Sequence, residues 1–221
     1  MISLEEAEQM TGNEPGDIRI RQETASDYLA SEAMIRDAFW NKYAPGSDEH
    51  YLVKLMRDHP SYIPELTRIA EVDGAVAGAV YYTRSSVVDG ETRTEVITFG
   101  PLGVAPRYQK MGIGRQLLAE TLAKAKELGF RAVIIFGDPA YYSRFGFTGC
   151  DRFNITTADG KNFDAFMAVE LYDGALKGVS GEFMESSVFQ AINDPSGLEN
   201  YDSQFPRREK LVLPGQLGTG E

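Results

Sequence analysis

The alternation of hydrophobic and polar positions predicts a strand and two helices near the start of the chain. A short strand is expected over Asp17–Arg21. Thr24-Ala-Ser-Asp27 then has the hydroxyl-to-acid spacing of a helix start, and apolar residues follow at helical spacing as far as Phe39. A second helix is expected over His50–Arg57, before a proline-containing stretch ends the helical region.

Two Asp-Gly pairs, Asp73-Gly74 and Asp89-Gly90, divide the next segment into three runs of β-forming residues. Such a pair favours a tight turn with positive φ, so the runs are predicted to form antiparallel hairpins. Proline has no N–H for the ladder, and Gly100-Pro101 therefore predicts a bulge or an opening near the end of the third strand. The three expected strands are Thr67–Val72, Ala75–Val88 and Thr92–Val104.

An apolar stripe from Ile113 to Leu128 predicts an amphipathic helix with Gly129 as its C-terminal cap. Ala132–Phe136 is a continuous apolar run, typical of a buried strand. A short helix over Ala140–Arg144 and a last strand over Phe163–Leu171 complete the pattern.

This order predicts an α/β (α+β) fold: a mixed, mostly antiparallel central sheet with one parallel pair, flanked by helices. We expect one domain over residues 17–171 and a C-terminal extension over residues 172–221 that packs on it. The end of the extension, Leu213–Glu221, is expected to be frayed.

Composition narrows the classes of function. The chain has 221 residues, 43% hydrophobic and 25% charged, as in ordinary globular proteins. A net charge of −11 argues against general nucleic-acid binding and would attract a cationic substrate, although acidity also simply favours solubility. The single cysteine, Cys150, fits a reducing cytoplasm. The polar N-terminus does not look like a signal peptide, and no apolar run is long enough to span a membrane.

The segment from Leu102 to Leu117 carries the strongest functional pattern, because a strand leads into a glycine-containing loop and then a helix. The first N–H groups of a helix have no partner within it and favour an anion. Gly112 and Gly114 would let a phosphate approach the backbone, and Arg107, Lys110 and Arg115 add positive charge to an acidic protein. A Rossmann loop would instead follow the first strand of a βαβ unit, and no P-loop motif is present.

Gln109-Lys-Met-Gly112-Ile-Gly114 resembles the Gln/Arg-x-x-Gly-x-Gly/Ala signature of the GNAT N-acetyltransferases. The resemblance runs from about Ile18 through Leu171 and is strongest to the YhbS-like branch, on the basis of Tyr141-Tyr-Ser-Arg-Phe-Gly-Phe147 and the segment from Phe166 to Gly181. It implies the acyl-CoA N-acyltransferase fold and acetyl-coenzyme A as co-substrate. The residues that it places on the coenzyme are Leu102, Gly103, Val104, Gln109, Lys110, Met111, Gly112, Ile113, Gly114, Arg115 and Tyr142.

The resemblance also implies catalytic roles. Tyr142 aligns with the tyrosine that protonates the departing thiolate, although it could instead pack on the sheet. The backbone N–H of Leu102 would stabilise the oxyanion. No general base is evident: acids on the strand of Glu95 serve in some relatives, whereas the alternative is a solvated acid beside Arg93. His50 and His59 are expected to have surface roles, and no zinc spacing is present.

We therefore expect an N-acetyltransferase that moves an acetyl group from acetyl-coenzyme A to a small-molecule amine by direct attack in a ternary complex. The alternatives are a non-catalytic acyl-coenzyme A binding module and a transferase that modifies proteins. No metal, nucleic-acid or membrane partner is expected, and a homodimer is compatible with this interpretation.

Overall fold

One mixed β-sheet runs through the part of the chain that the computed structural model describes, residues 17–216. Its main path has the order β1-β2-β3-β4-β5-β8-β6, while β9 pairs with β3 and β7. The strands are β1 (Ile18–Gln22), β2 (Arg68–Val72), β3 (Ala75–Asp89), β4 (Thr92–Val104), β5 (Ala132–Phe136), β6 (Thr148–Gly149), β7 (Ile155–Thr157), β8 (Phe166–Glu170) and β9 (Gly181–Met184).

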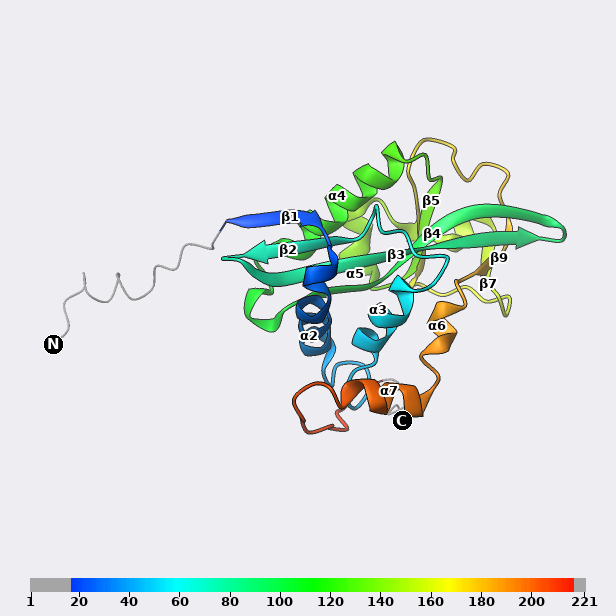
Figure 1. Cartoon of the computed structure of the whole chain (residues 1–221). Helices are drawn as coiled ribbons and strands as arrows, with labels where there is room; N and C mark the ends of the chain where they lie inside the picture. The colour runs from blue at the N-terminus through cyan, green and yellow to red at the C-terminus, as the bar shows by residue number, and fades with distance from the viewer. Residues whose placement is uncertain (1–16, 217–221) are drawn as a thin grey trace.

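Helices cover both faces of this sheet, with α4 on one side and α2 and α3 on the other (Figure 1). The α-helices are α2 (Tyr28–Phe39), α3 (Glu49–Arg57), α4 (Ile113–Glu127), α5 (Pro139–Tyr142), α6 (Val188–Ala191) and α7 (Pro195–Asp202). Short 3₁₀ turns span Ala25–Asp27, Pro106–Tyr108, Ser143–Phe145 and Cys150–Phe153.

The strand β3 joins the two layers of the core. Val80 and Tyr82 pack with the α4 side, whereas Ala79 and Tyr81 pack with α2 and α3. All four side chains are fully buried. Successive residues of a strand point to opposite faces, so a strand covered on both sides must be apolar at nearly every position.

The sheet opens where β4 meets β5. These two strands are parallel but share one paired position, Ile97 with Val133, although both continue beyond it. On its other edge β4 pairs with β3, and the register shifts so that Tyr82 faces Phe99 while Val80 faces Leu102. Gly100 and Pro101 thus form the bulge predicted from the sequence, and the diverging ends of β4 and β5 leave room for a ligand.

Most expected elements are confirmed, including the hairpin at Asp73-Gly74, the strand Ala132–Phe136 and the cap at Gly129, which has φ +82°. The predicted strand Phe163–Leu171 is shorter, as Phe166–Glu170. One parallel pair was predicted, but β7 and β9 form a second one. The sequence did not reveal this pair because β9 belongs to the segment after Leu171.

That segment contributes β9, α6 and α7 to the described structure, and none of these elements was predicted. The strand β9 extends the sheet beside Ser86–Val88 of β3, and α7 lies against α2 and α3 (Figure 1). Arg36 of α2 binds Asp202 of α7 at 2.6 Å. The division after residue 171 stays a prediction, and residues 217–221 of the expected frayed end lie outside the described residues.

Candidate active site

A cleft of about 910 Å³ lies where β4 and β5 diverge, between the C-terminal part of α2 and the start of α4. It brings together every residue that the sequence placed on a coenzyme. These residues are Leu102, Gly103, Val104, Gln109, Lys110, Met111, Gly112, Ile113, Gly114, Arg115 and Tyr142.

The first turn of α4 forms one end of the cleft. Gly112 precedes the helix with φ +81°, a backbone conformation that residues with a Cβ rarely adopt. The side-chain amide of Gln109 donates a hydrogen bond from Nε2 to the Val104 carbonyl at 3.2 Å, which connects the loop to the end of β4. A Cβ on Gly114 would lie 3.0 Å from the Tyr141 hydroxyl, so glycine keeps this approach to the helix open. The result is a free helix N-terminus facing a cavity, an arrangement that favours an anion.

Four cationic side chains line the same cleft, and none of them forms an ion pair within residues 17–216. They are Lys42, Lys110, Arg115 and Arg144. Of the cations singled out from the sequence, Arg107 does not line the cleft, and its guanidinium stacks over the Tyr108 ring at 4.6 Å. Uncompensated positive charge in a protein of net charge −11 is what a phosphate-bearing ligand requires.

Tyr142 forms the other end of the cleft. Its ring packs against Phe99 and Phe147 at centroid distances of 5.8 and 5.7 Å, and Gly137 makes room because a Cβ there would overlap the Tyr142 ring. The Asp138 carboxylate caps the short helix by accepting from the Ala140 N–H at 2.9 Å. Burial raises the pKa of Tyr142, so its hydroxyl is protonated at neutral pH.

Glu95 does not line this cleft. Its carboxylate forms an ion pair with Arg84 at 2.9 Å, and the residue borders a second, separate cavity. A role for Glu95 as general base stays a prediction to which this position gives no support. The expected surface role of His50 is wrong, because its side chain is completely buried against Asp202 of α7.

Sequence reasoning missed the side of the cleft that α2 supplies. Ala38 and Phe39 from the end of this helix and Tyr43 just after it line the cavity, as do Tyr108 and Phe136. Helical periodicity marks Ala38 and Phe39 as apolar but does not show that they face a cavity rather than the core. Their contribution depends on how α2 packs across β4, which a local pattern does not reveal.

The described residues contain no candidate metal site, no membrane-spanning helix and no reactive cysteine. Across residues 17–216 there is no cluster of three or more His, Cys, Asp or Glu side chains that could hold a metal ion. No helix in this range is long and apolar enough to cross a membrane. Cys150 is fully buried, and burial raises the pKa of its thiol to about 12, so it behaves as a small core residue rather than a nucleophile.

Comparison with known proteins links this cleft to one family. The Acetyltransferase (GNAT) family model matches residues 30–147. The uncharacterized N-acetyltransferase YhbS of Escherichia coli K12 is 37% identical over 109 residues, which cover 49% of this chain and 64% of the relative. The uncharacterized N-acetyltransferase YjhQ of the same strain is 31% identical over 105 residues, which cover 47% of this chain and 58% of that relative. The matched stretch thus spans less than two thirds of these curated relatives.

Two solved structures extend the match beyond that stretch. The crystal structure of Escherichia coli YhbS in complex with CoA has a TM-score of 0.69 and 30% identity, covering 80% of this chain and 92% of that one. A GNAT acetyltransferase from Brucella melitensis in complex with acetyl-CoA has a TM-score of 0.63 and 24% identity. The match covers 78% of this chain and 98% of that one. The resemblance and the fold inferred from the sequence are confirmed.

Proposed function

Because this chain belongs to the GNAT acetyltransferase family, we propose that it is an N-acetyltransferase that passes an acetyl group from acetyl-coenzyme A to a small-molecule amine. One observation carries the proposal. A single cleft joins a helix N-terminus with cations that form no ion pair within residues 17–216 at one end to a partly buried, protonated tyrosine at the other.

The cleft suits the two chemically different parts of the coenzyme. The backbone N–H groups that follow Gly112, together with Lys110 and Arg115, would bind the diphosphate. Leu102, Gly103 and Val104 line the path from there toward Tyr142, where the pantetheine arm would lie. The relatives solved with CoA or acetyl-CoA support this assignment.

In the proposed reaction, the neutral amine nitrogen attacks the thioester carbonyl carbon and a C–N bond forms. The carbonyl oxygen becomes an oxyanion, which the backbone N–H of Leu102 at the β4 bulge would stabilise. The C–S bond then breaks, and the Tyr142 hydroxyl gives its proton to the departing thiolate. The nitrogen loses its extra proton to water or to a base of the acceptor site.

The test is acetyl transfer to a panel of amines, followed through the release of free thiol. Tyr142→Phe keeps the ring packing against Phe99 and should lower kcat on the order of 10²-fold, with little change in the affinity for acetyl-coenzyme A. Tyr141→Phe is the matched control, because Tyr141 is the neighbouring tyrosine of the same helix, and it should retain nearly full kcat.

Three results would count against the proposal. Full kcat in both variants, when chemistry limits the rate, would remove Tyr142 from the reaction. Tight coenzyme binding without thiol release for any amine in the panel would favour the non-catalytic binding module. Acetylation of a protein lysine but of no small amine would favour the protein-modifying alternative.

A further inference from the structure

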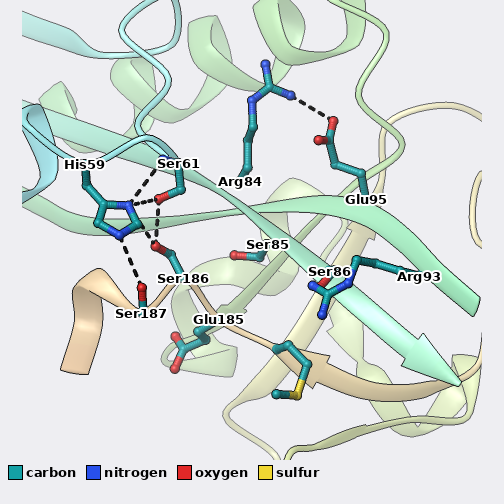
Figure 2. Close-up of a pocket in the computed structure, with 11 residues that line it drawn as sticks. His59, Ser61, Arg84, Ser85, Ser86, Arg93, Glu95, Glu185, Ser186 and Ser187 are labelled. Atoms are coloured by element: carbon teal, nitrogen blue, oxygen red, sulfur yellow. Dashed lines mark hydrogen bonds and ion pairs between the residues drawn. The ribbon is translucent and has the colours of Figure 1, made fainter. Parts of the chain in front are cut away.

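A second cavity, of about 480 Å³, lies at the edge of β3 where this strand changes its neighbour. The backbone N–H of Arg84 donates to the Ser61 carbonyl at 2.8 Å, and two residues later Ser86 pairs with Met184 of β9. Ser85 sits between these two pairings (Figure 2). None of the residues that line this cavity also lines the coenzyme cleft.

A histidine and three serines form one wall of the cavity and hold one another in place. His59 lies 2.8 Å from the Ser61 hydroxyl through Nδ1 and 3.2 Å from the Ser187 hydroxyl through Nε2. The hydroxyls of Ser61 and Ser186 are 2.6 Å apart. This wall joins the loop after α3 to the start of α6, so its geometry is fixed by two distant segments (Figure 2).

The two guanidinium groups of the cavity are already engaged. Arg84 binds Glu95 at 2.9 Å and stacks over the Phe130 ring at 5.2 Å. Arg93 donates to the Ser86 hydroxyl at 2.6 Å. These cations therefore have protein acceptors, which weakens the case for an anionic ligand.

Two polar groups of the cavity have no such neighbour within residues 17–216. The hydroxyl of Ser85 is buried, with the residue 8% exposed, and it makes no hydrogen bond. Figure 2 shows this hydroxyl on the side of the strand where Ser186 and Glu185 lie. The Glu185 side chain is exposed at the rim of the cavity, and its carboxylate forms no ion pair or hydrogen bond in this range. The buried hydroxyl without a partner is unfavourable, and the Glu185 carboxylate is a negative charge at the rim that no cation of the described residues neutralises.

We propose that this cavity binds a small ligand through an ammonium group, with Glu185 as its counter-ion and the Ser85 hydroxyl as a hydrogen-bond acceptor. An ammonium group has three donors and no acceptor, so it matches the two groups that lack partners. The acidic protein as a whole would also attract a cation. This site does not depend on the acetyl-transfer proposal, because it is separate from the coenzyme cleft.

The test uses ethanolamine as the probe, without coenzyme, and follows backbone amide NMR signals of the full chain. Saturable shifts are expected at Ser85, Glu185 and Ser186, with none at Gly112 in the coenzyme loop. Glu185→Gln should weaken binding about tenfold, because it removes the charge while keeping the shape of the side chain. Glu182→Gln is the matched control: Glu182 is an exposed acid on β9 that does not line the cavity, and its loss should leave the affinity unchanged.

Ethylene glycol, which lacks the ammonium group, should produce no saturable shift. Equal affinity in Glu185→Gln and the wild type, or shifts that never saturate, would overturn the proposal. Ser85→Ala provides a second variant that removes the buried hydroxyl without adding volume, and it should weaken ethanolamine binding several-fold.

Discussion

The start of α4 and the layer of α2, α3 and α7 lie on opposite faces of the sheet and are built in contrasting ways (Figure 1). The α4 entrance is formed by consecutive residues, Gln109 to Arg115, and works through backbone geometry. The helical layer is held by charged side chains that come from distant parts of the chain. Its central residue, Arg57, binds Glu23 at 2.8 Å and also Glu32, and these three side chains are at most 5% exposed.

The same charged group reaches the C-terminal segment. The hydroxyl of Tyr201 in α7 donates to Glu32 in α2, while Tyr81 of β3 donates to Glu23 at 2.8 Å. A second buried cluster joins Arg36 and His50 to Asp202. One region is thus sensitive to the shape of the backbone and the other to the pairing of buried charge. Variants in the helical layer should therefore change the stability of the protein, whereas variants at the α4 entrance should change coenzyme binding.

The largest effect is expected from Arg57→Met. This change keeps much of the side-chain volume but leaves Glu23 and Glu32 buried without their cation, which should cost ~3–5 kcal/mol of unfolding free energy. Chemical denaturation measures the loss. Lys54→Met on the same helix is the control, because its ion pair with Asp58 is exposed and should contribute ~1 kcal/mol or less. Equal losses in the two variants would show that burial of the charges does not matter.

A smaller effect is expected from His50. Burial, opposed by Asp202 and aided by Arg36, lowers the pKa of His50 to about 4, whereas an unfolded histidine titrates near ~6.5. The unfolded state therefore binds the proton more readily, and this contribution to stability is present above pH 6.5 and is lost as the pH falls toward 4. The loss between pH 6.5 and 4.5 should be about 2 kcal/mol.

The adjacent Glu49 acts in the opposite direction, because burial raises its pKa to about 7. The quantity to measure is therefore the difference between the wild type and His50→Gln, in unfolding free energy against pH. The variant should lack the acid-side loss that belongs to His50. Parallel curves for the two proteins would contradict the prediction.

The smallest of the three effects concerns the α4 entrance. Gly112→Val puts a branched side chain on a residue with φ +81° where the diphosphate would lie, and affinity for coenzyme A should fall about tenfold, ~1.4 kcal/mol. Gly129→Val is a matched control at the other end of the same helix, with φ +82° and no atom within 4 Å of the added Cβ. It should bear similar strain yet bind coenzyme A normally in isothermal titration. Equal weakening in both variants would mean that strain in α4, rather than the site, is responsible.

The contrast also explains what could be predicted from the sequence. The turn at Asp73-Gly74, the cap at Gly129 and the loop before Ile113 follow from local backbone preferences, and the structure has all three. The β9 strand could not be found in this way, because its four residues find their partners in β3, about a hundred positions earlier in the chain, and in β7. His50 looked like a surface residue because Asp202, its neighbour in space, lies far away in sequence. The cavity around Ser85 combines four separate segments and has no local signature.

The position of β9 has a consequence for aggregation. Along Ser86–Val88 this strand occupies the hydrogen-bonding edge of β3 that would otherwise be open, and β7 in turn pairs with β9. A chain that stopped before Gly181 would leave this stretch of β3 unpaired, as an exposed edge able to recruit a strand from another molecule. The C-terminal segment therefore protects this edge of the sheet from pairing with another molecule. Shortened forms of the protein are expected to associate with one another before they lose the fold of their core.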